Sequence, residues 1–160
     1  MVNIYQKNKH NVGTVGARLH FENNRIQHAG MLSIINPKNT LIISHLGLQS
    51  NYNYSEICDV IGNTAAFLLI SKNLFNDIGG FNENYIECFE DVELNLECLL
   101  RNKRNIFVGN AVCYHYESVT RGKSRQDLMR QTQDYKMRII PFILDKDSPK
   151  INKYIKTIKK

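Results

Sequence analysis

Two adjacent carboxylates stand at the predicted start of a helix in the middle of the chain. Apolar residues recur there at helical spacing, at Val92, Leu96, Leu99 and Leu100. The pattern predicts an amphipathic helix with Glu93 and Glu97 turned to water. Glu90 and Asp91 then fall in or just before its first turn, where free N–H groups and the helix dipole favour a carboxylate anion. Such a group can act as a general base; capping of the helix is the simpler interpretation.

A histidine follows the next predicted strand. The apolar run from Ile106 to Tyr114 is a strand candidate, and His115 comes directly after it. Strand ends commonly carry site residues in α/β proteins. Arg121 and Lys123 follow in a basic loop and could contact a phosphate. The plainer alternatives are a histidine hydrogen-bonded within the fold and two solvated basic side chains.

Several short motifs follow one another along the chain. They are Gly62-Asn63-Thr64-Ala65-Ala66-Phe67-Leu68-Leu69-Ile70, Gly79-Gly80-Phe81-Asn82-Glu83, Glu90-Asp91-Val92-Glu93-Leu94, His115-Tyr116-Glu117-Ser118 and Arg121-Gly122. In this order they resemble the C-terminal half of a family 2 glycosyltransferase. Val15–Leu19 and Arg25–Gly30 are similar to the segment that precedes those motifs in such enzymes. The resemblance covers roughly residues 12 to 125, and the combination of motifs is more specific than any one of them.

The resemblance implies a metal-dependent A-type fold that transfers a sugar, with inversion, from a nucleoside diphosphate sugar to an acceptor hydroxyl. In that family the Asp of the Glu-Asp motif is the usual base, so Asp91 takes this role and Glu90 orients or binds the acceptor. His115 would be a ligand of a divalent metal, Mn²⁺ or Mg²⁺, and Arg121 and Lys123 would contact the diphosphate. The acceptor would be a glycan or a lipid-linked molecule.

The donor-binding half of such enzymes, which ends in an Asp-x-Asp motif, is not recognisable here. The Asp-x-Asp of this chain, Asp145-Lys146-Asp147, comes after the histidine and lies between Pro141 and Pro149, as expected of a loop. We therefore expect a fragment that is inactive alone. A non-catalytic module that recognises a glycan or a partner protein is the alternative from another class.

The composition is that of one ordinary globular domain, with 42% hydrophobic and 22% charged residues among 160. The predicted class is α/β, a mixed sheet flanked by helices. Residues 1–140 would form the acceptor-side part and residues 141–160 a basic amphipathic tail. The net charge of +6 is concentrated in that tail, which would fit a helix that is solvated, packed on another segment or in contact with anionic lipid. Nucleic acid is not expected, because the basic residues lack interleaved aromatics.

The chain is expected to be cytoplasmic, with peripheral membrane contact as an alternative. Its four cysteines form no Cys-x-x-Cys pair and are typical of reduced, partly buried thiols. The start of the chain is polar, unlike a signal peptide, and no apolar run approaches the roughly 20 residues that span a bilayer. A half-domain would expose sheet edges, so a homo-oligomer is one expected state.

Strand signals precede the motifs. Val15–Phe21 and Arg25–Met31 flank a turn and predict a hairpin. Leu46–Glu56 is polar and indicates a surface loop. Ile61–Ile70 is nearly continuous in apolar residues, which predicts a central strand buried on both faces.

Two further helices are expected. Ser71 would cap a short helix that Gly79-Gly80 ends, since glycine adopts the left-handed conformation readily. The last helix would start at Ser124 and stop at Pro141. Between them, aromatic residues could form a sugar platform, with core packing as the alternative; these are Phe81, Tyr85 and Phe89.

Overall fold

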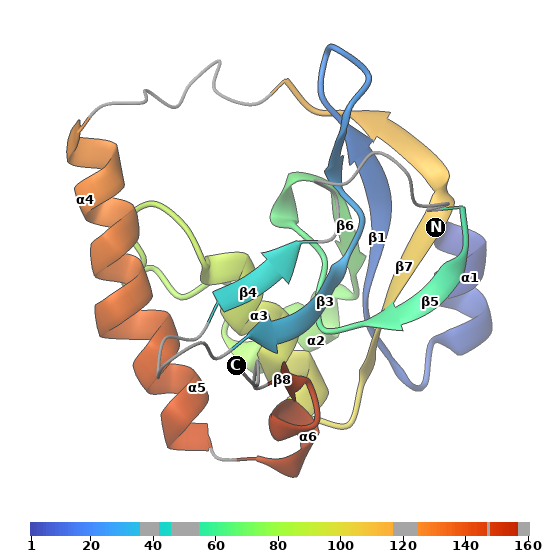
Figure 1. Ribbon diagram of the computed structural model, residues 1–160. Coiled ribbons are helices and arrows are strands. Elements are labelled where there is room, and N and C mark those ends of the chain that lie inside the picture. The colour runs from blue at the N-terminus through green and yellow to red at the C-terminus, as the bar shows by residue number, and fades with distance from the viewer. Residues whose placement is uncertain (36–41, 46–54, 117–124, 147, 157–160) are drawn as a thin grey trace.

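The computed structural model describes residues 1–35, 42–45, 55–116, 125–146 and 148–156 (Figure 1). The predicted class is confirmed: a mixed β-sheet is flanked by helices. The elements in chain order are α1 (Val2–Asn8), β1 (Val12–His20), β2 (Ile26–His28), β3 (Met31–Ile35), β4 (Ile42–His45), β5 (Ile57–Val60), the 3₁₀ turn η2 (Ala65–Phe67), β6 (Leu68–Ile70), α2 (Lys72–Ile78), α3 (Glu90–Leu100), β7 (Arg104–Tyr114), α4 (Arg125–Asp134), the π-helical segment η3 (Tyr135–Ile139), α5 (Ile140–Lys146), α6 (Pro149–Asn152) and β8 (Ile155–Lys156).

The larger sheet is built around the parallel pair β1 and β7. Val15 of β1 lies opposite Ile106 of β7, and further along Leu19 lies opposite Cys113. β5 pairs with β7, while β2 and β6 both pair antiparallel with the other edge of β1. The predicted hairpin is therefore confirmed as the β1–β2 pair. Because β1 and β7 are parallel, their carboxyl ends lie at the same edge of the sheet.

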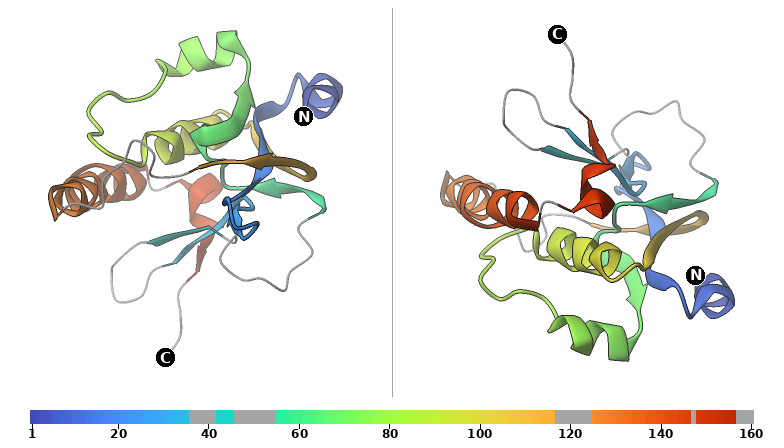
Figure 2. Two further views of the ribbon diagram at one scale, coloured as in Figure 1. Left: turned by 90° about the horizontal axis from the view of Figure 1, so that it is seen from above. Right: turned by 90° about the horizontal axis from the view of Figure 1, so that it is seen from below.

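A second sheet of three strands has the order β4-β3-β8. Figure 2 shows it on one side of the larger sheet, with α2 and α3 on the other side. β3 runs antiparallel to β4 and parallel to β8, where Ile34 lies opposite Ile155. The predicted helical tail is therefore wrong beyond Asn152, because Ile155, a β-branched residue, joins a strand instead.

The main core gathers apolar side chains from distant segments. Its buried members are Met31, Ile61, Val92, Leu96, Leu99, Ile139, Ile143 and Ile151. The apolar stripe predicted for α3 is confirmed, since three of these residues come from that helix. Ile143 and Ile151 come from the last twenty residues, so the end of the chain packs on the same core as α3. The domain boundary after residue 140 stays a prediction.

The predicted central strand from Ile61 to Ile70 is wrong. The chain turns after Ile61, and Thr64 begins η2 by accepting a hydrogen bond from the Ala66 N–H at 3.5 Å. Only Leu68–Ile70 pair with β1. The buried side chain of Asn63 causes the turn, because it hydrogen-bonds groups of the neighbouring strands instead of continuing the ladder.

The predicted stop of the last helix at Pro141 is also wrong. The helix continues from α4 through η3 into α5. At the end of η3 the Ile140 N–H bonds the Tyr135 carbonyl five residues earlier. Pro141 follows in α5 and supplies no N–H to the helix. Asp145 lies on α5 rather than in the predicted loop. The predicted start, Ser124, lies outside the described residues, and α4 is described from Arg125.

Both ends of α2 are confirmed. The Ser71 hydroxyl accepts a hydrogen bond from the Leu74 N–H at 3.1 Å. Gly79 follows the helix with a φ of 97°, and its N–H bonds the Asn76 carbonyl at 3.0 Å. A residue with a Cβ would be strained at this position, which explains the glycine.

Three further predictions concern membrane spans, the cysteines and a surface loop. In the described ranges, no helix is long and apolar enough to cross a membrane. The four cysteines lie within the described ranges, where none of them forms a disulfide, and Cys98 is buried while Cys58 is exposed. Most of the predicted surface loop Leu46–Glu56 lies outside the described residues.

Candidate functional site

Asp91 lies in the first turn of α3 and is half-buried. Its Oδ2 accepts a hydrogen bond from the Ala65 N–H of η2 at 2.9 Å. Within the described part of the chain, its Oδ1 accepts none. The contact therefore fixes the direction of the carboxylate and leaves one oxygen that can accept a proton.

An unusual backbone turn precedes Asp91. Phe89, the residue before α3, has a φ of 79°, and its side chain does not cap the helix. A left-handed conformation is rare for a residue with a Cβ and costs roughly 1–3 kcal/mol. The Phe89 ring lies against the Tyr135 ring, with centroids 5.8 Å apart. This turn sets the direction in which Glu90 and Asp91 enter the helix.

A buried polar network lies behind Asp91. Thr14, Asn63, Asn95 and Asn105 are all 0% exposed. Asn95 accepts hydrogen bonds from the Thr14 hydroxyl at 2.7 Å and the Asn63 N–H at 3.1 Å. It donates to the carbonyls of Asn63 at 2.8 Å and Asp91 at 2.7 Å. The network thus joins β1, the turn before η2 and the first turn of α3.

Glycines leave the space that this network occupies. A Cβ on Gly16 would lie 2.2 Å from Asn63 Oδ1, and a Cβ on Gly62 would lie 2.7 Å from the Asn95 Cβ. Such distances are too short for any side chain. The absence of a Cβ at Gly16 and Gly62 therefore allows β1, the turn and α3 to pack closely together.

The turn before η2 also contacts β2. His28 is buried, and its Nε2 accepts hydrogen bonds from the Gly30 N–H at 3.2 Å and the Thr64 N–H at 3.3 Å. Because Nε2 accepts both bonds, it carries no proton. Two successive N–H groups, those of Thr64 and Ala65, therefore bind His28 and Asp91, respectively.

Asp134 binds the loop that leads to α3. Its carboxylate is fully buried and accepts hydrogen bonds from the N–H groups of Ile86, Glu87 and Cys88 and from the Arg138 guanidinium. Burial alone would raise the pKa of Asp134, but these donors outweigh it and hold the pKa below its ordinary value. We call residues 86–88 the 86–88 loop.

The lowered pKa of Asp134 implies a defined acid sensitivity. A carboxyl whose folded pKa is depressed contributes stability that is present above its unfolded pKa, about 3.9. The contribution is lost as the pH falls through the folded pKa. We expect Asp134→Asn to lower the free energy of unfolding by a constant amount between pH 7 and 5. Below pH 4 the gap between the variant and the parent protein narrows. Urea titrations across this range measure it.

The matched control for this experiment is Asp145→Asn. Asp145 is an exposed carboxylate on the helix that continues from Asp134. Its substitution should leave the urea midpoint nearly unchanged at every pH. A stability gap for Asp134→Asn that stays constant down to pH 3 would contradict the expected titration.

Glu93 and Glu97 do not face open water as predicted. The Glu93 carboxylate accepts hydrogen bonds from the Asn82 amide at 3.0 Å and the Tyr85 hydroxyl at 2.6 Å. Burial, and then this bond to Glu93, raise the pKa of Tyr85 above its ordinary value. Glu97 forms an ion pair with Arg101. Both carboxylates are half-buried because residues 79–85 cover this side of α3.

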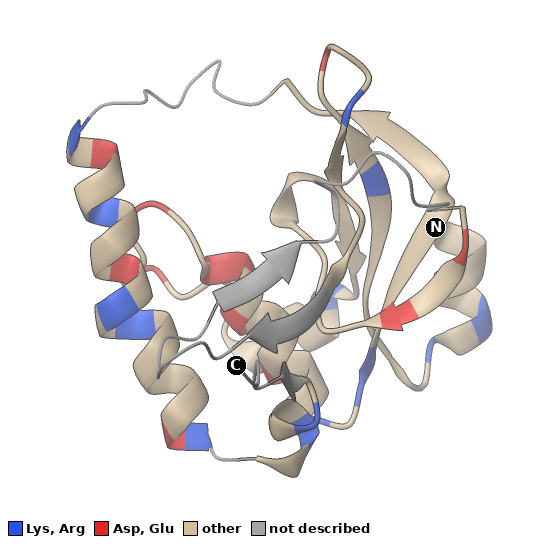
Figure 3. Cartoon of the chain, viewed as in Figure 1, with Lys and Arg blue, Asp and Glu red and all other residues tan. Residues whose placement is uncertain are grey.

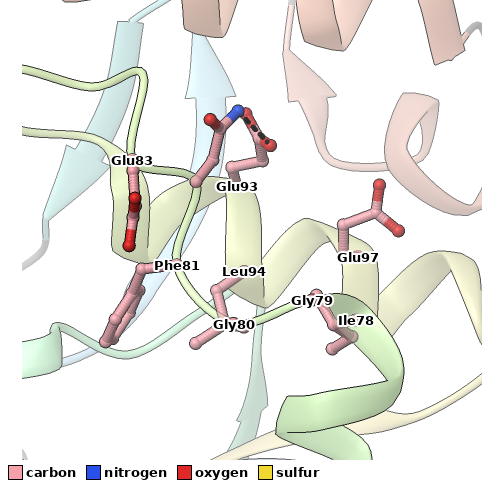
Figure 4. A pocket seen from close by; sticks show the side chains of 9 residues that line it. Ile78, Gly79, Gly80, Phe81, Glu83, Glu93, Leu94 and Glu97 are labelled. Carbon is pink, nitrogen blue, oxygen red and sulfur yellow. Dashed lines mark hydrogen bonds between the residues drawn. The ribbon is translucent and has the colours of Figure 1, made fainter.

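A hollow of about 440 Å³ lies between the end of α2 and α3 (Figure 4). It is lined by Ile78, Gly79, Gly80, Phe81, Asn82, Glu83, Glu93, Leu94 and Glu97. Asp91 does not line it, since its carboxylate contacts Ala65 on another side of α3. The aromatic residues considered for a sugar platform take part in packing: Phe81 lies edge-to-face on Phe75 at 5.3 Å, and Phe89 lies on Tyr135.

His115 lies directly after β7, where the sequence places it, and is half-buried. Its Nδ1 is 2.9 Å from Gln27 Oε1. Because an amide oxygen only accepts, Nδ1 donates this hydrogen bond, and in a neutral ring Nε2 is then the nitrogen with the free electron pair. The His115 N–H donates to the His20 carbonyl at 2.9 Å. In the described ranges these bonds lead to β2 and β1, and none joins His115 to Asp91.

The described residues do not form a complete metal site. No group of three His, Cys, Asp or Glu side chains in this part of the chain is arranged to hold an ion. His115 offers one ligand through Nε2, and a divalent cation needs several more. Its role as a metal ligand stays a prediction. Arg121 and Lys123, predicted to contact phosphate, lie outside the described residues.

Two known proteins are similar to this chain in sequence. It is 33% identical over 141 residues to uncharacterized protein y4gI of Sinorhizobium fredii (strain NBRC 101917 / NGR234), covering 79% of this chain and 15% of that protein. It is 24% identical over 128 residues to O-antigen biosynthesis protein RfbC of Myxococcus xanthus, covering 74% of this chain and 10% of RfbC. The chain thus matches only a small part of either relative. No protein-family model and no solved structure matches it.

Proposed function

We propose that this chain is the acceptor-side part of a glycosyltransferase with an A-type fold of family 2. The observation that carries the proposal is the Asp91 carboxylate, which one N–H holds at the start of a helix while its second oxygen accepts no hydrogen bond from the described residues. The similarity to an O-antigen biosynthesis protein supports a role in making a glycan. The motifs around Glu90-Asp91 and His115 support the same class.

In the proposed reaction, Asp91 accepts the proton of an acceptor hydroxyl. The oxygen of that hydroxyl attacks the anomeric carbon of a nucleoside diphosphate sugar, and the nucleoside diphosphate leaves with the electrons of the broken bond. Attack on the face opposite the leaving group inverts the anomeric centre. A positioned base contributes typically about 10²–10⁴-fold to such a rate. Glu90, beside the base, would orient the acceptor.

The diphosphate needs positive charge as it leaves. We assign Arg121 and Lys123 to this task, and His115 Nε2 to a divalent cation, Mn²⁺ or Mg²⁺, that the donor would bring with it. The free electron pair on Nε2, oriented by Gln27, is what supports His115. Further ligands of the cation would come from the diphosphate and from groups outside the described residues.

Titration calorimetry tests the proposal. Uridine and thymidine diphosphate sugars are titrated with manganese into this chain and into a version extended upstream along its reading frame. We expect heat of binding from the extended protein alone, and its loss in His115→Ala. His10→Ala, which removes an exposed histidine, is the control. Binding to neither protein would contradict the proposal and favour the non-catalytic module; equal binding to both would contradict the expected division of the site.

A further inference from the structure

We propose that Asp134 is a positioning residue for the Glu90-Asp91 pair and acts through the 86–88 loop. The functional meaning of the pair rests on the function proposed above. The structural coupling between Asp134 and Asp91 can be tested without any substrate.

The first step is the contact between Asp134 and the loop. The Ile86 N–H lies 3.0 Å from both carboxylate oxygens. The next two N–H groups, of Glu87 and Cys88, reach Oδ2 at 2.6 and 3.1 Å. Three consecutive N–H groups thus converge on one buried anion, and hydrogen bonds to an anion are stronger than those between neutral groups. The position of Asp134 therefore determines the path of the loop.

The second step runs from the loop to α3. Tyr135, next to Asp134, packs on Phe89, next to the 86–88 loop. At the α4–η3 junction, Asp134 thus binds the 86–88 loop and the adjacent Tyr135 packs on Phe89, the residue that follows this loop. The next residues are Glu90 and Asp91. Figure 3 shows acidic residues in the segment between α2 and α3 and in the first turn of α3, beside a helix that carries several basic residues.

The third step concerns the start of α3. The first turn of a helix has unpaired N–H groups and frays easily without a cap. Phe89 supplies no side-chain cap. The contacts of the preceding loop therefore support this turn together with the Asn95 amide and the Ala65 N–H. If the loop moved, Asp91 Oδ2 would shift from the Ala65 N–H, while the core-facing remainder of α3 would stay in place.

Amide hydrogen exchange of the 160-residue chain, followed by NMR at pH 7, tests this coupling. Asn at position 134 keeps the shape of the side chain but turns an NH₂ group toward N–H donors. We expect Asp134→Asn to accelerate exchange about tenfold or more at Ile86, Glu87 and Cys88, and also at Ala65, because local opening needs no global unfolding. Exchange in the β1–β7 pair should accelerate by no more than the factor that corresponds to the loss of unfolding free energy in the urea titrations, and by less than exchange in the 86–88 loop. The Ala65 amide shift should move as well.

Two outcomes would overturn the proposal. Equal acceleration at all amides would mean that Asp134 only stabilises the whole fold. Acceleration in the 86–88 loop without any change at Ala65 would mean that the loop does not position Asp91. Asp145→Asn is the matched control, and Arg138→Gln, which removes one of the Asp134 partners, should give the same pattern at smaller amplitude if Asp134→Asn fails to fold. The exchange experiment contains no nucleotide sugar. Its result therefore stands even if the calorimetric titrations show no binding of a nucleotide sugar.

Discussion

Asp91→Asn is expected to lower the rate of sugar transfer by about 10²–10⁴-fold. The Asn side chain can still accept the Ala65 hydrogen bond through its amide oxygen, so the start of α3 keeps its geometry. It cannot take the proton of the acceptor hydroxyl. The measurement is the initial rate of nucleoside diphosphate release by the upstream-extended protein, with kcat and KM determined separately; the loss should fall on kcat.

Asp77→Asn is the control for this variant. Asp77 is exposed on α2 and loses the same charge, so its rate should match that of the parent protein. A fall of less than about threefold in Asp91→Asn would rule out Asp91 as the base, because general-base assistance is far larger.

The second large effect concerns stability. Asn95→Ala is expected to lower the free energy of unfolding by about 3–5 kcal/mol. Each buried polar group that loses its hydrogen-bond partner costs about 1–3 kcal/mol. The groups left without their partner are the Thr14 hydroxyl, the Asn63 N–H and two carbonyls, those of Asn63 and Asp91. Urea unfolding followed by circular dichroism measures the change.

Asn73→Ala provides the comparison for the stability measurement. Asn73 is exposed on α2, and surface substitutions usually change stability by no more than about 0.5 kcal/mol. If Asn95→Ala cost less than about 1 kcal/mol, water would have to replace the lost side chain, and the network would not determine the packing of α3 on β1.

Local signals in the sequence predicted the helices best. The apolar spacing of α3 and the Ser71 and Gly79 ends of α2 depend on neighbouring residues alone, and all are confirmed. The strand predicted for the apolar run from Ile61 to Ile70 failed because an apolar run does not by itself specify a buried strand. Ala66 and Phe67 lie in η2 and are exposed. The predicted helix end at Pro141 failed as well. The π-helical turn that precedes this proline leaves no signal in the pattern of apolar residues.

The contacts around Asp91 were largely beyond prediction. Asp134 binds backbone N–H groups, which every residue has, and they lie 46–48 positions away in the chain. Asn95 did leave a signal: it stands three residues after Val92 and four before Leu99, on the side of α3 that faces the core. An amide on an apolar stripe must find buried partners, and these came from β1 and the turn before η2.

The parallel pairing of β1 with β7 bears on how the protein is made. Thr14 and Asn105, which are hydrogen-bonded in this pair, are 91 residues apart in the chain. Contacts over such separations form late and slowly, because the loop between them must first be closed. During synthesis at roughly 5–20 residues per second, the β1–β2 hairpin can form early. The central pair of the sheet must wait until β7 has left the ribosome, so β1 exposes one unpaired edge for several seconds, and such an edge can pair with another chain.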